Sequence, residues 1–361
     1  GNVGADGNQG YSANLRIREG SGSLNAKCRF NAKAISYDIK GEANNLHIQH
    51  FMPEGGMGDL TGHIYIKGRG TDFTSNATKL EANADIKKFS FGQYNLDKIV
   101  ADAAINRGIA HVKIDSDNQL MKGLITLDAL INPKKLQATV STDLWHADLR
   151  GLKLVEKPLN ISLCSHIDIL SDMKQIYGIQ GVINDLTVRD SLKVFRPDEI
   201  QMNVFTSRDT TRADVSCGDF HIMLNAKGGY EALVSKGQKF TDELSAQLDN
   251  KKIVQKKLRS LLPLANLYLT TGKENPFSRM LAYFGYKFKD AVIDMKSSPY
   301  SGLNGNMQLV ELKSNNMQLD TIRFFIASDS TKCNYNGQIR NGKNNPQYVF
   351  NTLFDGYVHE D

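Results

Sequence analysis

The strongest constraint on this chain is a strict alternation of apolar and polar side chains with a period of two residues. Residues 11–18 read Tyr-Ser-Ala-Asn-Leu-Arg-Ile-Arg, and residues 159–169 read Leu-Asn-Ile-Ser-Leu-Cys-Ser-His-Ile-Asp-Ile. The same habit returns at 24–32 and 136–144. Successive side chains of a β-strand point to opposite faces, so this pattern predicts strands with one apolar face and one wet face.

Short breaks separate the alternating runs, which recur about every 10–15 residues, as in an all-β chain. Asn336-Gly337 and Asn341-Gly342 are predicted to form hairpin turns, because Asn and Gly tolerate positive φ. Connections this short predict antiparallel neighbours.

One stretch departs from the β pattern. Leucines at helical spacing predict a helix from Thr241 to about Leu262, stopped by Pro263, and residues 275–285 predict a second short helix. The first helix carries the most basic patch of the chain, which we expect either to be a solvated helix face or to contact a lipid headgroup or membrane surface. The patch consists of Lys251, Lys252, Lys256, Lys257 and Arg259.

These patterns divide the chain into three predicted segments. Residues 1–240 are expected to form an elongated β-groove, residues 241–290 a helical insert, and residues 291–361 a continuation of the groove.

Several classes of function find no support in the sequence. The net charge is only +5 and the basic residues are scattered, so we expect no nucleic-acid partner. The four cysteines form no CxxC pair, and His47 and His50 would point to opposite faces of a strand, so no metal site is predicted. No hydrolase, nucleotide-binding or zinc-protease motif is present, so we expect neither a cofactor nor enzymatic activity.

A long series of amphipathic strands must cover its apolar face with a second sheet, by closing into a barrel, or with a non-protein apolar partner. Open sheets of more than about ten strands curl. We therefore expect an all-β, elongated, curled antiparallel sheet whose hydrophobic groove binds lipid. The candidate groove-lining residues are Leu15, Ile17, Leu24, Phe30, Ile64, Ile66, Leu136, Val140, Leu159, Ile161, Leu163, Ile167, Ile169, Ile222 and Leu224.

The organisation resembles TamB-like and AsmA-like proteins of the bacterial envelope. The resemblance rests on the runs at 46–48, 62–68, 96–102 and 123–127, on a recurring x-Asp-x-Ile strand start, and on residues 272–277, which look like versions from Bacteroidota-type bacteria. It covers most of the chain but lacks the C-terminal domain typical of TamB itself.

The resemblance implies a β-taco fold, a periplasmic location and an inner-membrane anchor. The sequence has no run of about 18 apolar residues, so we expect that anchor to lie outside this chain, which would be a middle to C-terminal-side fragment. The implied function is transfer of phospholipid, or another lipid, between the inner and outer membranes in support of outer-membrane biogenesis, with an outer-membrane barrel as a possible partner.

Two other interpretations stay open. The chain could be the scaffold of a translocation and assembly module that passes outer-membrane proteins along its strand edges. It could instead be a secreted β-solenoid adhesin or polysaccharide-binding protein, although rungs of about 20–25 residues, which solenoids require, are not evident.

Overall fold

The computed structural model describes residues 1–7, 9–19, 21–32, 35–191, 193–314 and 317–359, which form 24 strands and three α-helices. The chain divides into two compact units, Gly1–Met173 with Ile183–Arg196, and Lys174–Val182 with Pro197–Asp361. The boundary passes through β13 (Tyr177–Asp190). The three segments predicted from the sequence do not follow this division.

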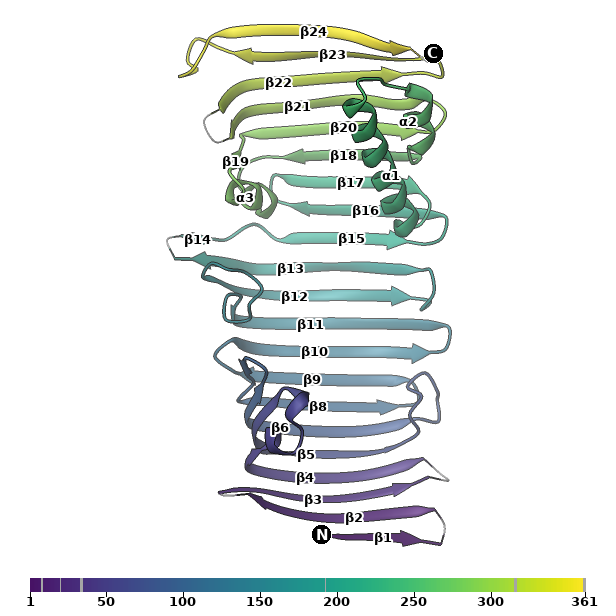
Figure 1. Ribbon diagram of the computed structural model, residues 1–361, viewed down its shortest axis with the longest axis vertical. Helices are drawn as coiled ribbons and strands as arrows, with labels where there is room; N and C mark the ends of the chain where they lie inside the picture. The colour runs from purple at the N-terminus through teal and green to yellow at the C-terminus, as the bar shows by residue number, and fades with distance from the viewer. Residues whose placement is uncertain (8, 20, 33–34, 192, 315–316, 360–361) are drawn as a thin grey trace. The chain divides into compact units, whose positions relative to one another are not determined.

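The first unit is an antiparallel sheet in which consecutive long strands pair (Figure 1). Its strands are β1 (Asn2–Asp6), β2 (Gly10–Glu19), β3 (Gly22–Asn31), β4 (Ser36–His47), β5 (Met57–Arg69), β6 (Lys79–Phe91), β7 (Tyr94–Asn95), β8 (Ile99–Asn106), β9 (Ile109–Asp117), β10 (Met121–Asn132), β11 (Lys135–Asp148), β12 (Leu159–Ser171) and β14 (Val194–Phe195).

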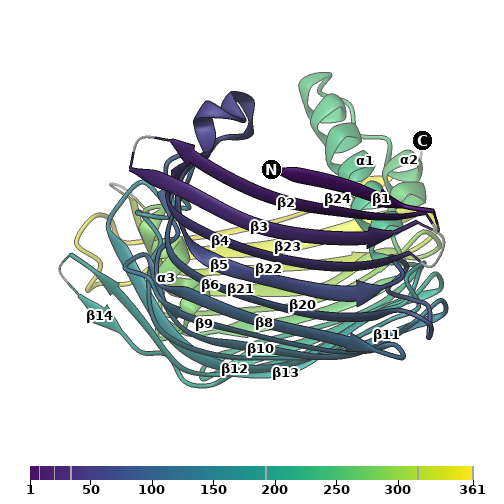
Figure 2. The ribbon, with the colours of Figure 1, turned by 90° about the horizontal axis from the view of Figure 1, so that it is seen from below.

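The strands of the first unit bend along their length, so the sheet is a trough when viewed along the strand stack (Figure 2). Register shifts accompany the bend at Ala43/Leu46 in β4, Thr61/Gly62 in β5 and Leu144/Ala147 in β11. Such bulges add a residue to one strand and increase its local curvature. They lie toward the end of the strands where residues 48–56, 92–98, 118–120 and 149–158 connect them; we call this end the long-loop rim.

The long-loop rim is tied together by hydrogen bonds between its loops. The 3₁₀ helices η1 (Ile48–His50) and η2 (Pro53–Gly55) stand here. The side-chain amide of Asn118 donates to the Asn95 carbonyl at 2.8 Å, and the Tyr94 hydroxyl donates to the Leu152 carbonyl at 3.2 Å.

The second unit is also antiparallel, with consecutive long strands paired from β15 to β24. Its strands are β15 (Ile200–Thr206), β16 (Thr210–Cys217), β17 (Phe220–Lys227), β18 (Ala265–Thr271), β19 (Tyr286–Lys287), β20 (Asp290–Ser298), β21 (Gly302–Ser314), β22 (Met317–Ser328), β23 (Lys332–Asn341) and β24 (Phe350–His359).

The helices of the second unit lie at the ends of its strands (Figure 1). Helices α1 (Tyr230–Asp249) and α2 (Gln255–Leu261) stand at one end, and α3 (Pro276–Tyr283) stands at the other. The short helix predicted at 275–285 is confirmed by α3. The predicted start at Thr241 is wrong, because α1 begins at Tyr230, whose N–H donates to the Thr206 hydroxyl at 3.0 Å. Strand β18 also lies inside the predicted helical insert.

A predicted turn is also corrected in the second unit. Asn336-Gly337 lies in the middle of β23, whereas Asn341-Gly342 ends that strand as predicted. A Cβ atom on Gly337 would lie 2.2 Å from the Phe354 ring, so the glycine leaves room for an aromatic side chain on the neighbouring strand. Gly337 is therefore a packing residue and not a turn residue.

The predicted all-β, antiparallel fold class is confirmed, and the sheet of each unit curls without closing. Fully buried apolar side chains are few and mostly small. In the described part of the first unit they are Ala43, Leu46, Ala110, Ala129, Ala138 and Ala147. This scarcity means that the fold is held mainly by its strand ladders and by contacts within one sheet layer.

Candidate functional site: an uncovered apolar face

The strand register of the first unit gathers its apolar side chains on one face. One row of cross-strand neighbours runs from β8 to β12 through Ala103, Val112, Leu127, Val140 and Ile167. Pairing in register keeps each row on one face, because side chains opposite one another share a face. The bend of the strands makes this the concave face, and we call it the apolar face.

The opposite face of the same strands is polar. The row one residue over consists of Asp102, Lys113, Thr126, Ser141 and His166. The Ser141 hydroxyl lies 3.0 Å from Nδ1 of His166. Side chains of this face are mainly solvent-exposed, as expected for an outer surface.

The apolar face of the first unit is only half-buried. The side chains of Leu15, Phe30 and Ile64 remain 36%, 44% and 43% exposed. Among the described residues of this unit, the strands pack only against their sheet neighbours and η1, and no second layer packs on the face. A contiguous exposed apolar surface of this kind marks a binding site.

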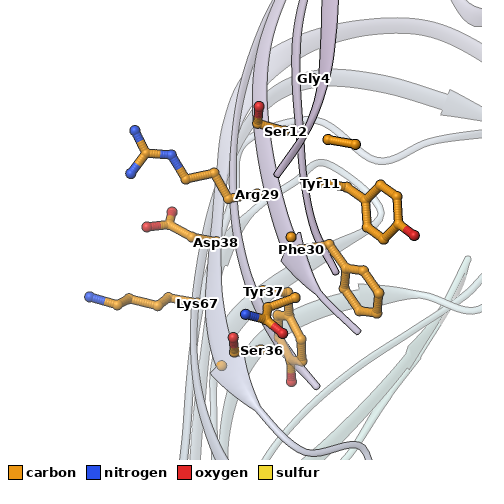
Figure 3. A pocket seen from close by; sticks show the side chains of 13 residues that line it. Gly4, Tyr11, Ser12, Arg29, Phe30, Ser36, Tyr37, Asp38 and Lys67 are labelled. Atoms are coloured by element: carbon orange, nitrogen blue, oxygen red, sulfur yellow. The ribbon is translucent and has the colours of Figure 1, made fainter. Parts of the chain in front are cut away.

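Aromatic side chains line the N-terminal end of this face. Tyr11, Phe30 and Tyr37 are cross-strand neighbours in β2, β3 and β4 and lie on the inside of the trough, while Arg29 and Asp38 project outward (Figure 3). The Tyr37 hydroxyl donates to the Gly70 carbonyl at 3.2 Å. This hydrogen bond places the tyrosine at the end of the strands away from the long-loop rim.

The second unit carries an apolar face of the same design. One row runs across its strands from β16 to β22: Val215, Ile222, Leu269, Ile293, Met307 and Phe324. The opposite face carries Asp214, Tyr268 and Asp294 at neighbouring positions. In each unit, therefore, the chain presents a continuous apolar surface.

The structure places the predicted groove-lining residues on these faces. Leu15, Ile17, Leu24, Phe30, Ile64, Ile66, Leu136, Val140, Leu159, Ile161, Leu163, Ile167 and Ile169 lie on the apolar face of the first unit, and Ile222 and Leu224 on that of the second. Their contact with lipid stays a prediction. Sequence reasoning missed Ala103, Val112 and Leu127, although the alternation Ile-Val-Ala-Asp-Ala-Ala-Ile-Asn at 99–106 carries the signal with small residues.

The predicted basic patch is partly used inside the protein. Lys257 forms an ion pair with Glu243 at 2.7 Å, and the Arg259 guanidinium donates to the Tyr300 carbonyl at 2.6 Å. Lys257 also holds the pKa of Glu243 below its ordinary value. The predicted headgroup contact is thus not supported for Lys257 and Arg259, and it stays a prediction for Lys251, Lys252 and Lys256.

The titratable groups of the long-loop rim pair with one another. Nδ1 of His47 lies 2.6 Å from a carboxylate oxygen of Asp59, and His50 contacts Glu19. Hydrogen bonds from Lys88 and then His47 lower the pKa of Asp59 to about 2. Within the described ranges, no group of three or more His, Cys, Asp or Glu side chains is arranged to hold a metal ion, and all four cysteines are free thiols.

No family model, curated protein or solved structure matches this chain. None of the described helices combines the length and the apolar character needed to cross a membrane.

Proposed function

We propose that the chain binds lipid acyl chains on its apolar faces and passes them along the strand stack of each unit. The observation that carries this proposal is the uncovered row structure of the first unit, in which apolar side chains follow one another from strand to strand with no described layer above them.

The energetics of such a surface suit a carrier. Each methylene group removed from water contributes about 0.8 kcal/mol, so an acyl chain can be held without directional contacts. The rows repeat at each strand, about 4.8 Å apart, and present similar side chains. A bound chain that shifts by one strand loses and regains similar contacts, which favours sliding over fixed binding.

The resemblance to TamB-like and AsmA-like proteins supplies the setting that we propose. In that setting the chain is a non-catalytic part of a longer, inner-membrane-anchored protein in the periplasm, and it moves phospholipid or another lipid between the two membranes. An outer-membrane barrel is the proposed protein partner. These elements extend the lipid-binding proposal and depend on it.

The test compares two triple variants of β12 in the full chain. The first, Ile161→Asp, Leu163→Asp and Ile167→Asp, changes the apolar face. The second, Asn160→Asp, Ser162→Asp and His166→Asp, is the matched control on the polar face of the same strand.

Lipid recovered with each purified protein is measured by mass spectrometry, and lipid transfer between donor and acceptor vesicles by fluorescence. We expect the first variant to lose both and the control to keep both, with circular dichroism showing that each stays folded. Unchanged lipid recovery in the first variant would refute the proposal. Recovery of an outer-membrane protein segment in place of lipid would favour the assembly scaffold.

A further inference from the structure

The rim of the first unit opposite the long-loop rim is lined with cations. It consists of the strand ends and connections from β5 to β11, and its positively charged residues are Arg69, Lys79, Arg107, Lys134 and Lys135. We call it the basic rim. All five side chains are exposed.

Strand register brings these cations into one line. Arg69 lies opposite Lys79, and Lys79 lies opposite Asn106, which precedes Arg107. The Ile131 N–H donates to the Gly108 carbonyl at 2.7 Å, which joins the turn carrying Arg107 to the end of β10. Lys134 and Lys135 follow directly in the next turn. The line therefore spans six long strands along one edge of the apolar face.

The cations of the basic rim have no anionic partners among the described residues. The one carboxylate described in their connections is Asp72, which accepts hydrogen bonds from the N–H and hydroxyl of Thr74 at 2.9 and 2.7 Å. At the long-loop rim, by contrast, Lys88 pairs with Asp59 at 2.9 Å, and Lys122 pairs with Asp117.

This arrangement is unfavourable for the protein alone. Like charges directly opposite in a sheet, as at Arg69 and Lys79, are destabilising. Arg107 adopts a φ of 53°, a left-handed conformation that favours Asn or Gly. An anion held above the rim would relieve the repulsion between the charges.

The basic rim borders the apolar face directly. Tyr37 lies opposite Gly68, the residue before Arg69, so an aromatic side chain with a polar end stands just inside a cation. Tyrosine followed by Lys or Arg is the order found where proteins meet the headgroup level of a membrane. An acyl chain on the apolar face would thus carry its polar end toward this rim.

We propose that the basic rim binds the phosphate of an anionic lipid headgroup, so that lipids lie on the first unit with their headgroups over this rim and not over the long-loop rim. The inference rests on the proposed function and deepens it, because it assigns the headgroup class and the orientation of the cargo.

The test uses the full chain with Lys79→Gln, Arg107→Gln and Lys134→Gln. The matched control removes three cations from the long-loop rim, with Lys98→Gln, Arg150→Gln and Lys153→Gln. Calorimetry measures binding of dioctanoyl phosphatidylglycerol, of dioctanoylglycerol, which has the same acyl chains but no phosphate, and of inorganic phosphate.

We expect the wild-type chain to bind the phosphatidylglycerol more tightly than the diacylglycerol. Removing three charges should weaken phosphatidylglycerol binding about tenfold at low salt. Diacylglycerol binding and the control variant should be unchanged. Salt of about 1 M, where the Debye length is about 3 Å, should remove the preference in the wild-type chain.

The inference is overturned if the wild-type chain binds both lipids equally, if the basic-rim variant keeps the preference, or if the control loses it to the same degree. Binding of inorganic phosphate as tight as that of the lipid would also overturn it, because the rim would then be a site for free anions. Failure of the wild-type chain to bind either lipid would instead refute the proposed function, so the two failures are distinguishable.

Discussion

Replacing Val140 with aspartate separates a lipid-covered face from an ordinary protein core. Val140 lies on the apolar face between Leu127 and Ile167, and it is half-buried. Its neighbour Ser141 points to the polar face, so Ser141→Asp introduces the same charge one residue away on the other side of the sheet.

The expected size of the effect follows from this burial. Fully burying a valine contributes about 1.5–3 kcal/mol, and a covering acyl chain removes only what the protein leaves exposed, so the lost apolar contact is worth under about 1 kcal/mol. A polar group buried without a partner costs about 1–3 kcal/mol more. Together these predict about 2–3 kcal/mol, or about 30- to 100-fold weaker lipid binding. The carboxylate accounts for most of this loss.

The assay measures the affinity for a fluorescent lipid and the urea unfolding midpoint of the lipid-free chain. Val140→Asp should weaken binding as calculated and change stability by only about 1 kcal/mol, since its carboxylate stays hydrated without lipid. Ser141→Asp should leave binding unchanged. If Val140→Asp unfolds the lipid-free chain, the face is a closed core and the reasoning is refuted.

Three further predictions concern the fold. Because the native pKa of Asp59, about 2, lies below its ordinary value of 3.8, its ionised form stabilises the fold above about pH 4 and this contribution is lost as the pH falls toward 2. Acid unfolding followed by circular dichroism should therefore be less steep over that range in Asp59→Asn, and an identical profile would contradict the assignment. Gly337→Ala should destabilise the chain by about 1–3 kcal/mol in urea unfolding, and Phe354→Leu should recover part of the loss; additive effects of the two changes would argue against this contact. The fully buried Asn275 caps α3 and donates to Asp219 at 2.6 Å, so Asn275→Ala should cost about 1–3 kcal/mol and expose the amides of α3 to hydrogen exchange; unchanged exchange would rule out the cap as the anchor of that helix.

The fold class and the assignment of faces could be predicted from the sequence because both depend on local alternation. At 159–169 the apolar residues recur every second position without interruption, and β12 follows them with its apolar side chains on one face. The predicted lining residues are correct in position because strand pairing in register continues a face that the sequence already defines.

Features that depend on neighbouring strands could not be predicted. The start of α1 at Tyr230 is fixed by a hydrogen bond to Thr206 from an earlier strand, and Gly337 reads as a turn until Phe354 lies beside it. The bulge after Ala43 has no local sequence signal, and the line of cations at the basic rim arises only when β5, β6 and β8 pair. Tertiary contact decided each of these.

The central claim is that lipid, and not protein, covers the apolar face. The most direct measurement places a photoreactive amino acid, one at a time, at each position from 163 to 167 in β12 and identifies the crosslinked products formed in the presence of phospholipid vesicles. The account predicts lipid adducts at Leu163, Ser165 and Ile167, and none at Cys164 and His166. Adducts without this two-residue period, or crosslinks from the apolar positions to protein alone, would contradict it.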